Sequence, residues 1–230
     1  MKMKTLTLGF IATISATMYT QAQSGGQFRA GINLANVSVN ANGRVNNANQ
    51  LTSFHAGFVG NVPIGGILYF QPGLLFTGKG SKTQSGDPSS GTYFKATTNP
   101  YYIEVPANLV LKAPVGTNRF FAGAGPYLSM GIAGKNKTEG KYLGFDFNSE
   151  RNIRFSNDDP TTTNYEEGAG FGIMRRFDYG VNGTAGIEGK SIVAGVNYGL
   201  GLAKLQSGSN SSADDNNKHR VLSFFVGFKF

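Results

Sequence analysis

The sequence predicts an all-β protein, an eight-stranded antiparallel transmembrane up-and-down β-barrel with long extracellular loops. Three observations predict it. Glycine is abundant, with 33 in 230 residues, about twice its ordinary share, and so much glycine disfavours helix interiors. Charged residues make up only 15%, whereas soluble domains carry about 25%. Apolar residues alternate with small or polar ones in eight separate segments, and this period of two is typical of β-strands.

The composition also excludes several classes of site. The chain has no Cys, which rules out disulfide scaffolds, cysteine zinc sites and thiol nucleophiles. The formal net charge of +8 is spread thinly along the chain, so we expect no nucleic-acid partner. No cofactor, metal site or catalytic group is expected.

The N-terminus has the pattern of a cleaved secretory signal. Lys2 and Lys4 precede a short apolar stretch, 6–16, and small residues follow up to Ala22. A basic start, a short apolar segment and a small-residue exit predict a signal peptide over 1–22. The apolar stretch is shorter than the about 20 residues that a membrane-spanning helix needs. The mature domain is then 23–230, exported to the outer membrane of a Gram-negative cell.

The first four predicted strands alternate as follows. Segment 28–37 places Phe28, Ile32 and Leu34 on one face and Arg29 and Asn33 on the other. The second, third and fourth strands are 53–62, 67–77 and 103–111, where large apolar residues again alternate with polar or small ones such as His55, Gln71, Glu104 and Asn108. Period two over four segments predicts consecutive antiparallel strands.

The last four predicted strands repeat the pattern. They cover 119–132, 179–188, 192–202 and 221–230. Their polar or small faces include Arg119, Glu188 and Lys229, and the last strand ends on Phe228 and Phe230. The final aromatics resemble the terminal signal that the barrel-assembly machinery reads.

The bulk of the two faces predicts which one faces outward. A narrow eight-stranded interior accommodates Gly, Asn, Ser and Thr, whereas a soluble core of such residues would be poorly filled. We therefore expect the Phe, Leu and Ile faces to contact lipid. The alternative is a secreted soluble β-barrel that binds a small apolar ligand, with its Phe-rich faces inward.

The connections give an independent indication of the same fold. Those at 63–66, 113–118 and 189–191 are short, whereas those at 38–52, 80–92, 134–177 and 206–219 are long and polar. This strict alternation is typical of outer-membrane barrels, which have short periplasmic turns and long outer loops. Connection 134–177 is expected to extend the strands beyond the membrane.

Several stretches resemble the PorT-like outer membrane β-barrel family common in Bacteroidota. They are FRAGIN (28–33), FHAGF (54–58), YFQPGL (69–74) with GKG (78–80), YIEVP (102–106), NLVLK (108–112), AGAGPY (122–127) and FKF (228–230). The resemblance spans nearly all of the mature chain and implies a fold, without a catalytic motif. It also implies a link to protein secretion, although no residue here singles out that role.

The inward faces suggest the candidate site. We expect an interior network of salt bridges and hydrogen bonds that fills the barrel and closes it to solutes, since buried charges need partners. A narrow polar conduit or a small-ligand niche is the alternative. The candidate residues are Arg29, His55, Gln71, Glu104, Asn108, Arg119, Glu188 and Lys229. The second histidine, His219, lies at a loop end and is expected to be solvated.

We therefore expect an integral outer-membrane β-barrel, non-porin and not an enzyme, with a structural or interaction role or an accessory role in secretion or assembly. Its expected partners are outer-membrane lipid, the barrel-assembly machinery during insertion, and a protein partner through loops 134–177 and 206–219. A membrane-embedded lipid-modifying enzyme is a minor alternative. It would use Ser53 and His55, which lie about 6.6 Å apart along one strand face, with Glu104 or Glu188 as the acid.

Overall fold

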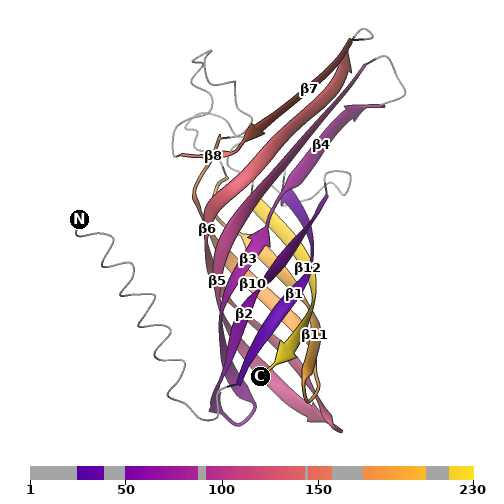
Figure 1. Ribbon diagram of the computed structural model, residues 1–230. Helices are drawn as coiled ribbons and strands as arrows, with labels where there is room; N and C mark the ends of the chain where they lie inside the picture. Colours follow the sequence, from indigo (N-terminus) through magenta and orange to yellow (C-terminus); the bar gives the residue numbers. More distant parts are fainter. Residues whose placement is uncertain (1–24, 39–49, 88–91, 143–144, 157–172, 206–217) are drawn as a thin grey trace, which may run out of the picture.

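Eight strands form a closed ring in the computed structural model of the protein (Figure 1). The structure describes residues 25–38, 50–87, 92–142, 145–156, 173–205 and 218–230. The predicted signal peptide, 1–22, lies outside these residues. The strands of the ring are β1 (Gly25–Ser38), β2 (Leu51–Gly65), β3 (Leu68–Gly78), β5 (Tyr93–Val115), β6 (Asn118–Tyr142), β10 (Phe177–Glu188), β11 (Ile192–Gly201) and β12 (Lys218–Lys229).

Each ring strand pairs antiparallel with the ring strands that come before and after it in the chain, and β1 pairs with β12 to close the ring. The predicted all-β antiparallel arrangement with eight strands in the ring is thereby confirmed. Among the described residues, no helix is long and apolar enough to cross a membrane.

Three short connections and the C-terminus lie at one end of the ring, which we call the turn end (Figure 1). Gly66 and Gly116 occupy two of these turns with φ of 56° and 61°. This left-handed backbone costs glycine little and is what tight hairpin turns require. We call the opposite end of the ring the loop end.

Two ring strands are longer than predicted and form a sheet that projects beyond the loop end (Figure 1). The expected strand 103–111 begins instead at Tyr93, and the expected strand 119–132 runs to Tyr142. Their outer parts pair with each other and with two edge strands, β4 (Ser81–Gly86) and β7 (Phe145–Asn152). Connection 134–177 therefore begins by extending the strands, as expected, and connection 80–92 contains the additional strand β4.

A small apolar cluster lies at the loop end. The short strands β8 (Arg154–Phe155) and β9 (Ile173–Met174) pair in parallel there. Ile153, Met174 and Leu205 are buried together against Val37 and Phe155. The cluster therefore ties the segments after β7 and β11 to the end of β1.

The register sets one face of every ring strand outward and the other inward. Phe28 pairs with Phe58 on one side and Phe228 on the other, and all three side chains are exposed on the outside. Ile32, four residues further along β1, lies between Phe54 and Phe224, again outward. This arrangement contradicts the soluble alternative, which required the Phe-rich faces to point inward.

The inward face holds polar groups and a small aromatic core. Val110, Phe121, Val193 and Phe225 form a buried cluster inside the ring. Glycines of β10 and β11 make room for the two phenylalanine rings, since a Cβ on Gly195 would lie 2.8 Å from Cζ of Phe225. The interior is therefore filled more by aromatic rings than the Gly, Asn, Ser and Thr pattern indicates.

Candidate functional site

Polar side chains inside the ring form three clusters that follow one another from the loop end to the turn end. The loop-end cluster contains Lys79, Glu104, Tyr127, Ser129 and Asp178. The middle cluster contains Asn33, His55, Thr77 and Ser223, and the turn-end cluster contains Arg29, Asn61, Gln71, Lys112, Glu188 and Lys229.

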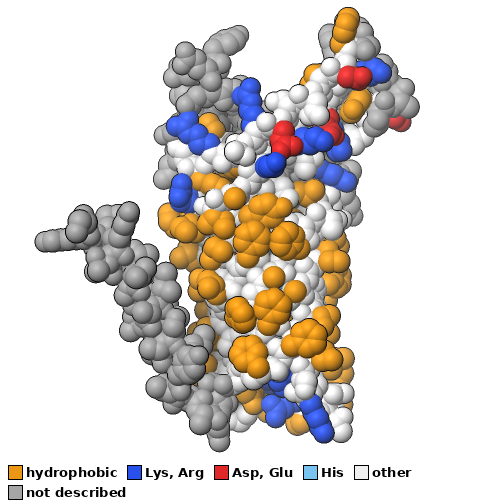
Figure 2. Space-filling view, viewed as in Figure 1, with side chains coloured by type: hydrophobic (Ala, Val, Ile, Leu, Met, Phe, Trp, Pro, Cys, Tyr) orange, Lys and Arg blue, Asp and Glu red, His pale blue; other side chains and the backbone are white. Residues whose placement is uncertain are grey.

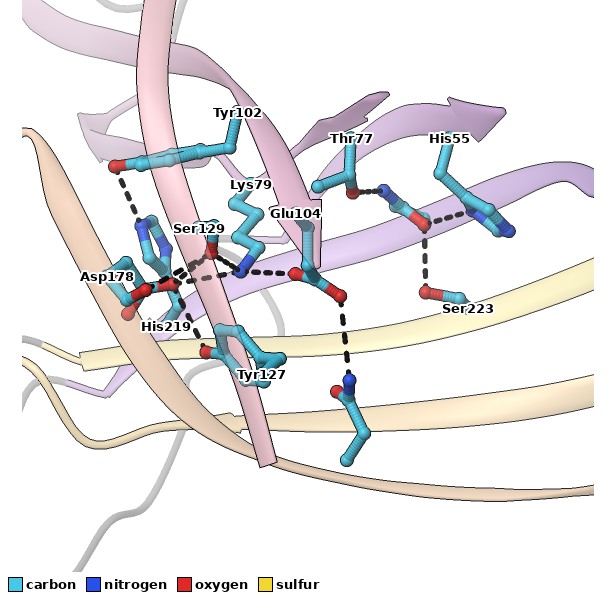
Figure 3. A network of polar contacts seen from close by, with 12 residues as sticks. His55, Thr77, Lys79, Tyr102, Glu104, Tyr127, Ser129, Asp178, His219 and Ser223 are labelled. Carbon is cyan, nitrogen blue, oxygen red and sulfur yellow. Dashed lines mark hydrogen bonds and ion pairs between the residues drawn. The ribbon is translucent and has the colours of Figure 1, made fainter. Parts of the chain in front are cut away.

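Lys79 is the centre of the loop-end cluster (Figure 3). Its Nζ lies 2.7 Å from Oε2 of Glu104 and 2.9 Å from Oδ2 of Asp178, and it donates to Oγ of Ser129 at 2.9 Å. An ammonium has three N–H donors, so these three acceptors on β5, β10 and β6 satisfy it completely. The cluster joins three strands to the segment that follows β3.

Aromatic groups surround this lysine. Nζ of Lys79 lies 3.9 Å from the ring centroid of Tyr127, whose hydroxyl donates to Oδ2 of Asp178 at 3.1 Å. Tyr102 lies further toward the loop end, where its hydroxyl contacts Nε2 of His219 at 3.3 Å (Figure 3). With one cation and two carboxylates, the cluster carries an excess of acidic groups.

The middle cluster is built on one amide. Nδ2 of Asn33 donates to Oγ1 of Thr77 and to the carbonyl oxygen of Gly78, both at 2.9 Å. Its Oδ1 accepts from Oγ of Ser223 at 2.8 Å and lies 2.7 Å from Nδ1 of His55. Because the amide oxygen is an acceptor, Nδ1 of His55 must carry the proton.

The turn-end cluster has the opposite charge balance. Glu188 accepts from Nζ of Lys112 at 2.5 Å and from Nζ of Lys229 at 2.7 Å, one on each carboxylate oxygen. Arg29 lies nearby, donates to Oε1 of Gln71 at 3.2 Å and stacks over the ring of Phe225 at 4.4 Å. Three cations therefore face one carboxylate, so the two ends of the interior differ in sign.

A cavity of about 40 Å³ lies between the two charged clusters. Arg29 and His55 line it from one side, and Glu104, Asn108 and Asn182 from the other. Oδ1 of Asn108 is buried and has no hydrogen-bond partner among the described residues. The volume suits one or a few water molecules, and such an oxygen is a natural partner for one.

The structure places the eight candidate residues as follows. Seven lie inside the ring, and Arg29, His55, Gln71, Glu104, Asn108 and Glu188 are buried there while Lys229 is part-buried. Arg119 departs from the expectation: it is exposed at the turn end and donates to the hydroxyl of Tyr69 at 3.5 Å. It directly follows the first residue of β6, where the ring ends and water reaches the side chain.

His219 also departs from the expectation. It is buried with 1% of its surface exposed, whereas a solvated side chain was predicted. Position 219 has the inward parity of β12, and its ring packs edge-on against Tyr102 with centroids 5.6 Å apart. The histidine therefore belongs to the interior although it lies next to a loop.

Three central charges were missed by the sequence analysis: Lys79, Asp178 and Lys112. Each lies one or two residues beyond the predicted end of its strand. Each also continues the inward parity, with Lys79 after Thr77, Asp178 before Gly180 and Lys112 after Val110. Extending the alternation by one step would have found all three.

Ser53 and His55, the pair considered for a lipid-modifying enzyme, are not hydrogen-bonded to each other among the described residues. His55 contacts Asn33, and Oγ of Ser53 has no hydrogen-bond partner among the described residues. Within the part of the chain that the structure describes, no group of three or more His, Asp or Glu is placed to hold a metal ion. The chain also has adjacent acidic residues at 158–159, 166–167 and 214–215, whose loop positions could suit a divalent cation, and all three pairs lie outside that part.

One family model matches the chain. The sequence model of the outer membrane protein beta-barrel domain matches residues 21–207. Among solved structures, Ail of Yersinia pestis is 13% identical with a TM-score of 0.41 and covers 90% of this chain and 99% of its own. Neisserial surface protein A is 16% identical, with a TM-score of 0.40 and coverage of 89% and 97%. The N-terminal barrel domain of Pseudomonas aeruginosa OprF is 10% identical, with a TM-score of 0.33 and coverage of 90% and 99%. No curated protein matches the chain.

Proposed function

The chain belongs to the outer membrane protein β-barrel domain family, and from this premise we propose that it is an integral outer-membrane β-barrel with a closed interior. In this proposal the ring spans the membrane and passes no solute. The loop end serves a structural or interaction role at the cell surface.

The apolar outer band is the observation that carries the proposal. Figure 2 shows hydrophobic side chains in a band across the visible face of the ring, with Lys and Arg beyond both edges of the band. Among the large apolar side chains on the outer face, Ile32, Phe58, Leu74, Leu128 and Phe228 are each more than half exposed. Contiguous apolar surface of this extent is costly in water and is what a membrane barrel presents to lipid.

The closed interior is supported by the clusters. Charged and amide side chains from strands that do not pair with each other meet across the interior in direct hydrogen bonds, as in the contacts from Lys112 on β5 to Asn61 on β2 and Glu188 on β10. The buried rings of Phe121 and Phe225 lie in the same interior. An eight-stranded barrel leaves room for little more than its own side chains.

Cell fractionation with gel electrophoresis tests the membrane assignment. We expect recovery in the outer-membrane fraction and a band that shifts when the sample is boiled, because a closed barrel resists detergent until heated. A soluble protein whose mobility is the same with and without boiling would overturn the assignment.

Electrical recording tests the closed interior. The purified protein is inserted into a planar lipid bilayer, and its insertion is checked independently by protease protection. We expect inserted protein to give no stable conductance steps. Reproducible steps that scale with the amount of inserted protein would support the narrow polar conduit instead.

The interaction role is proposed for the projecting sheet. All eight residues of its edge strand β7 are exposed, including Phe145 and Phe147. Its outer face carries cross-strand ion pairs, such as Lys95 with Glu139 at 3.1 Å and Lys141 with Asp146 at 3.9 Å. An unpaired edge with apolar and charged residues suits contact with another protein. The link to secretion or assembly that the PorT-like resemblance implies would act through this surface.

A further inference from the structure

Strand β7 forms one margin of the projecting sheet (Figure 1). It stands at the end of the strand order and pairs, among the described residues, with β6 alone. That pairing covers all eight residues from Phe145 to Asn152. Every second residue of such a strand directs its backbone N–H and C=O away from the sheet. The edge of β7 is therefore a template for one more strand.

The opposite margin of the same sheet is protected. Strand β4 has only six residues, carries Lys82 and ends at Gly86, whose φ of 80° interrupts the extended backbone. Its first residue, Ser81, is already bridged to Gln50. Short strands and lysines are ordinary means of preventing an edge from pairing with another chain. In contrast, β7 has no lysine or proline and carries two exposed phenylalanines.

The two faces of β7 differ in chemistry. The side chains of Phe145 and Phe147 are 81% and 44% exposed, and the ring of Phe147 lies over Gly140, where a Cβ would meet it. Asp146 and Glu150 lie on the other face, with side chains 78% and 46% exposed. The free edge therefore presents an aromatic face and an acidic face to whatever lies beside it.

Both carboxylates have capacity for a second cation. Nζ of Lys141 lies 3.9 Å from Oδ1 of Asp146, too far for a hydrogen bond. Lys135 donates to Oε1 of Glu150, and an ionised carboxylate has about four acceptor sites on its two oxygens. Both lysines belong to β6. A strand beyond β7 would reach the same carboxylates from the opposite direction.

We propose that an extended segment of a partner protein adds to β7 as an antiparallel strand. Its basic residues would lie opposite Asp146 and Glu150, and its apolar residues opposite Phe145 and Phe147. Residues directly opposite each other in an antiparallel pair share a face, with Cβ atoms about 4.5–5.5 Å apart. Backbone hydrogen bonds would provide affinity and the alternating side chains specificity. The inference rests on the proposed function and deepens it, because it names how the projecting sheet binds.

A second copy of this chain fits the edge less well. Two β7 strands paired antiparallel would also place residues of the same face opposite each other. The one basic residue of β7, Arg151, lies on the face of the two phenylalanines. A second β7 therefore offers no cation to Asp146 or Glu150. The occupant that fits is another protein whose strand alternates basic and apolar residues.

Fluorescence anisotropy with labelled synthetic peptides tests the proposal on the full mature chain in detergent micelles. In the probe EKTTVKV, the two lysines would lie opposite Glu150 and Asp146. The two valines would lie opposite the phenylalanines, and the first residue opposite Arg151. The control peptide EVTTKVK has the same composition with lysine and valine exchanged. We expect the probe to bind about tenfold more tightly than this control.

N-methylation of the probe tests the strand pairing itself. In an antiparallel pair, alternate residues direct their N–H groups to the neighbouring strand. One version of the probe is methylated at its second, fourth and sixth residues, and the other at its third and fifth. We expect one version to lose binding and the other to retain it. Equal binding of the two versions would overturn the strand addition.

Variants of β7 test the charge pattern. We expect Asp146→Asn/Glu150→Gln to lower the affinity for the probe about fivefold, and Asp146→Lys/Glu150→Lys to prefer the charge-reversed peptide EETTVEV. The matched control is Glu139→Gln, which removes a carboxylate from the same face of β6. That position is two strand spacings, about 10 Å, from the peptide, so binding should be unchanged. A loss of the same size in this control would reduce the effect to net charge and overturn the pairing.

The boiling shift and the oligomeric state of each sample separate the remaining outcomes. A protein that shows the shift but does not distinguish EKTTVKV from EVTTKVK refutes the strand addition and leaves the membrane assignment standing. A protein without the shift refutes the membrane assignment, and a partner at the cell surface is refuted with it. Dimerisation that occupies the edge and excludes the probe would assign β7 to a second copy and overturn the proposal.

Discussion

Glu188 connects two lysines from opposite sides of β10, and its carboxylate is almost fully buried. Replacing Glu188 with Gln leaves Lys112, whose side chain is 2% exposed, without its anionic partner. Breaking a buried ion pair by removing one partner is strongly destabilising, because the remaining charge is uncompensated. We expect Glu188→Gln to lower the free energy of unfolding by about 3 kcal/mol.

Urea titration of the protein refolded in lipid vesicles measures this loss. The control is Glu150→Gln, which removes a carboxylate from the exposed pair with Lys135. Exposed pairs contribute little, so the control should behave like the parent protein. Equal losses in the two variants would show that burial of the turn-end cluster has no energetic consequence.

The loop-end cluster gives a second prediction at the scale of residues. Lys79→Met leaves the carboxylates of Glu104 and Asp178 close together without the cation between them. We expect a loss of about 3 kcal/mol in the free energy of unfolding. The triple variant Lys79→Met/Glu104→Gln/Asp178→Asn removes the unpaired charges and should recover more than half of that loss. Simple addition of the three single losses would contradict the assigned contacts, since residues in one network are expected to couple.

The same residues show what alternation can and cannot predict. It assigns Arg29 and Glu188 to the interior because both lie within strands with strong apolar alternation. It gives no account of Arg119, whose inward parity is correct but whose position beside a turn exposes it. Parity fixes the direction of a side chain, whereas burial also depends on how far the ring extends along its axis.

At the scale of elements, the inward glycines set how closely the strands and interior rings approach. A Cβ on Gly195 would lie 2.5 Å from the carbonyl oxygen of Ala185, 2.8 Å from Cζ of Phe225 and 3.1 Å from Cζ of Phe121. Gly195→Ala must therefore displace the backbone at Ala185 and the ring of Phe225 together. We expect it to lower the free energy of unfolding by about 2 kcal/mol, as overpacking does.

Gly183 provides the matched control because it lies on the outward face of the neighbouring strand β10. A Cβ at Gly183 would meet nothing within 4 Å. Gly183→Ala should therefore be neutral or slightly stabilising, since alanine restricts the unfolded chain. Urea titration of both variants under the same conditions makes the comparison. A larger loss at Gly183 than at Gly195 would refute the inward assignment.

The ends of the elements were the hardest part to predict. Between Thr97 and Pro100, β5 carries only polar residues and a proline, so the apolar alternation that marks a lipid-facing strand disappears. The strand nevertheless continues, because β6 pairs with it throughout and β4 pairs with its outer part. Hydrophobic patterning detects the segment in contact with lipid, and strand pairing extends beyond that segment.

At the scale of the whole molecule, the connections fix the orientation. Because the number of ring strands is even, the start of β1 and the end of β12 lie at the same end of the ring. There the backbones of Gly26 and Phe230 exchange two hydrogen bonds, of 3.0 and 3.1 Å. The side chains of Phe228 and Phe230 are 60% and 77% exposed there. The alternation of short and long connections already predicts this arrangement, because it depends only on the spacing of strands along the chain.

This orientation predicts which residues are accessible from outside the cell. Asn148 lies on exposed β7 beyond the loop end, and exposed Lys190 lies in the short connection before β11. The chain has no Cys, so Asn148→Cys and Lys190→Cys each introduce the single thiol of the protein. A membrane-impermeant maleimide should label Cys at position 148 in intact cells and at position 190 only after the outer membrane is opened, because in the proposed orientation the membrane lies between position 190 and the medium. The reverse pattern would invert the protein in the membrane, and labelling of both positions in intact cells would contradict a spanning ring.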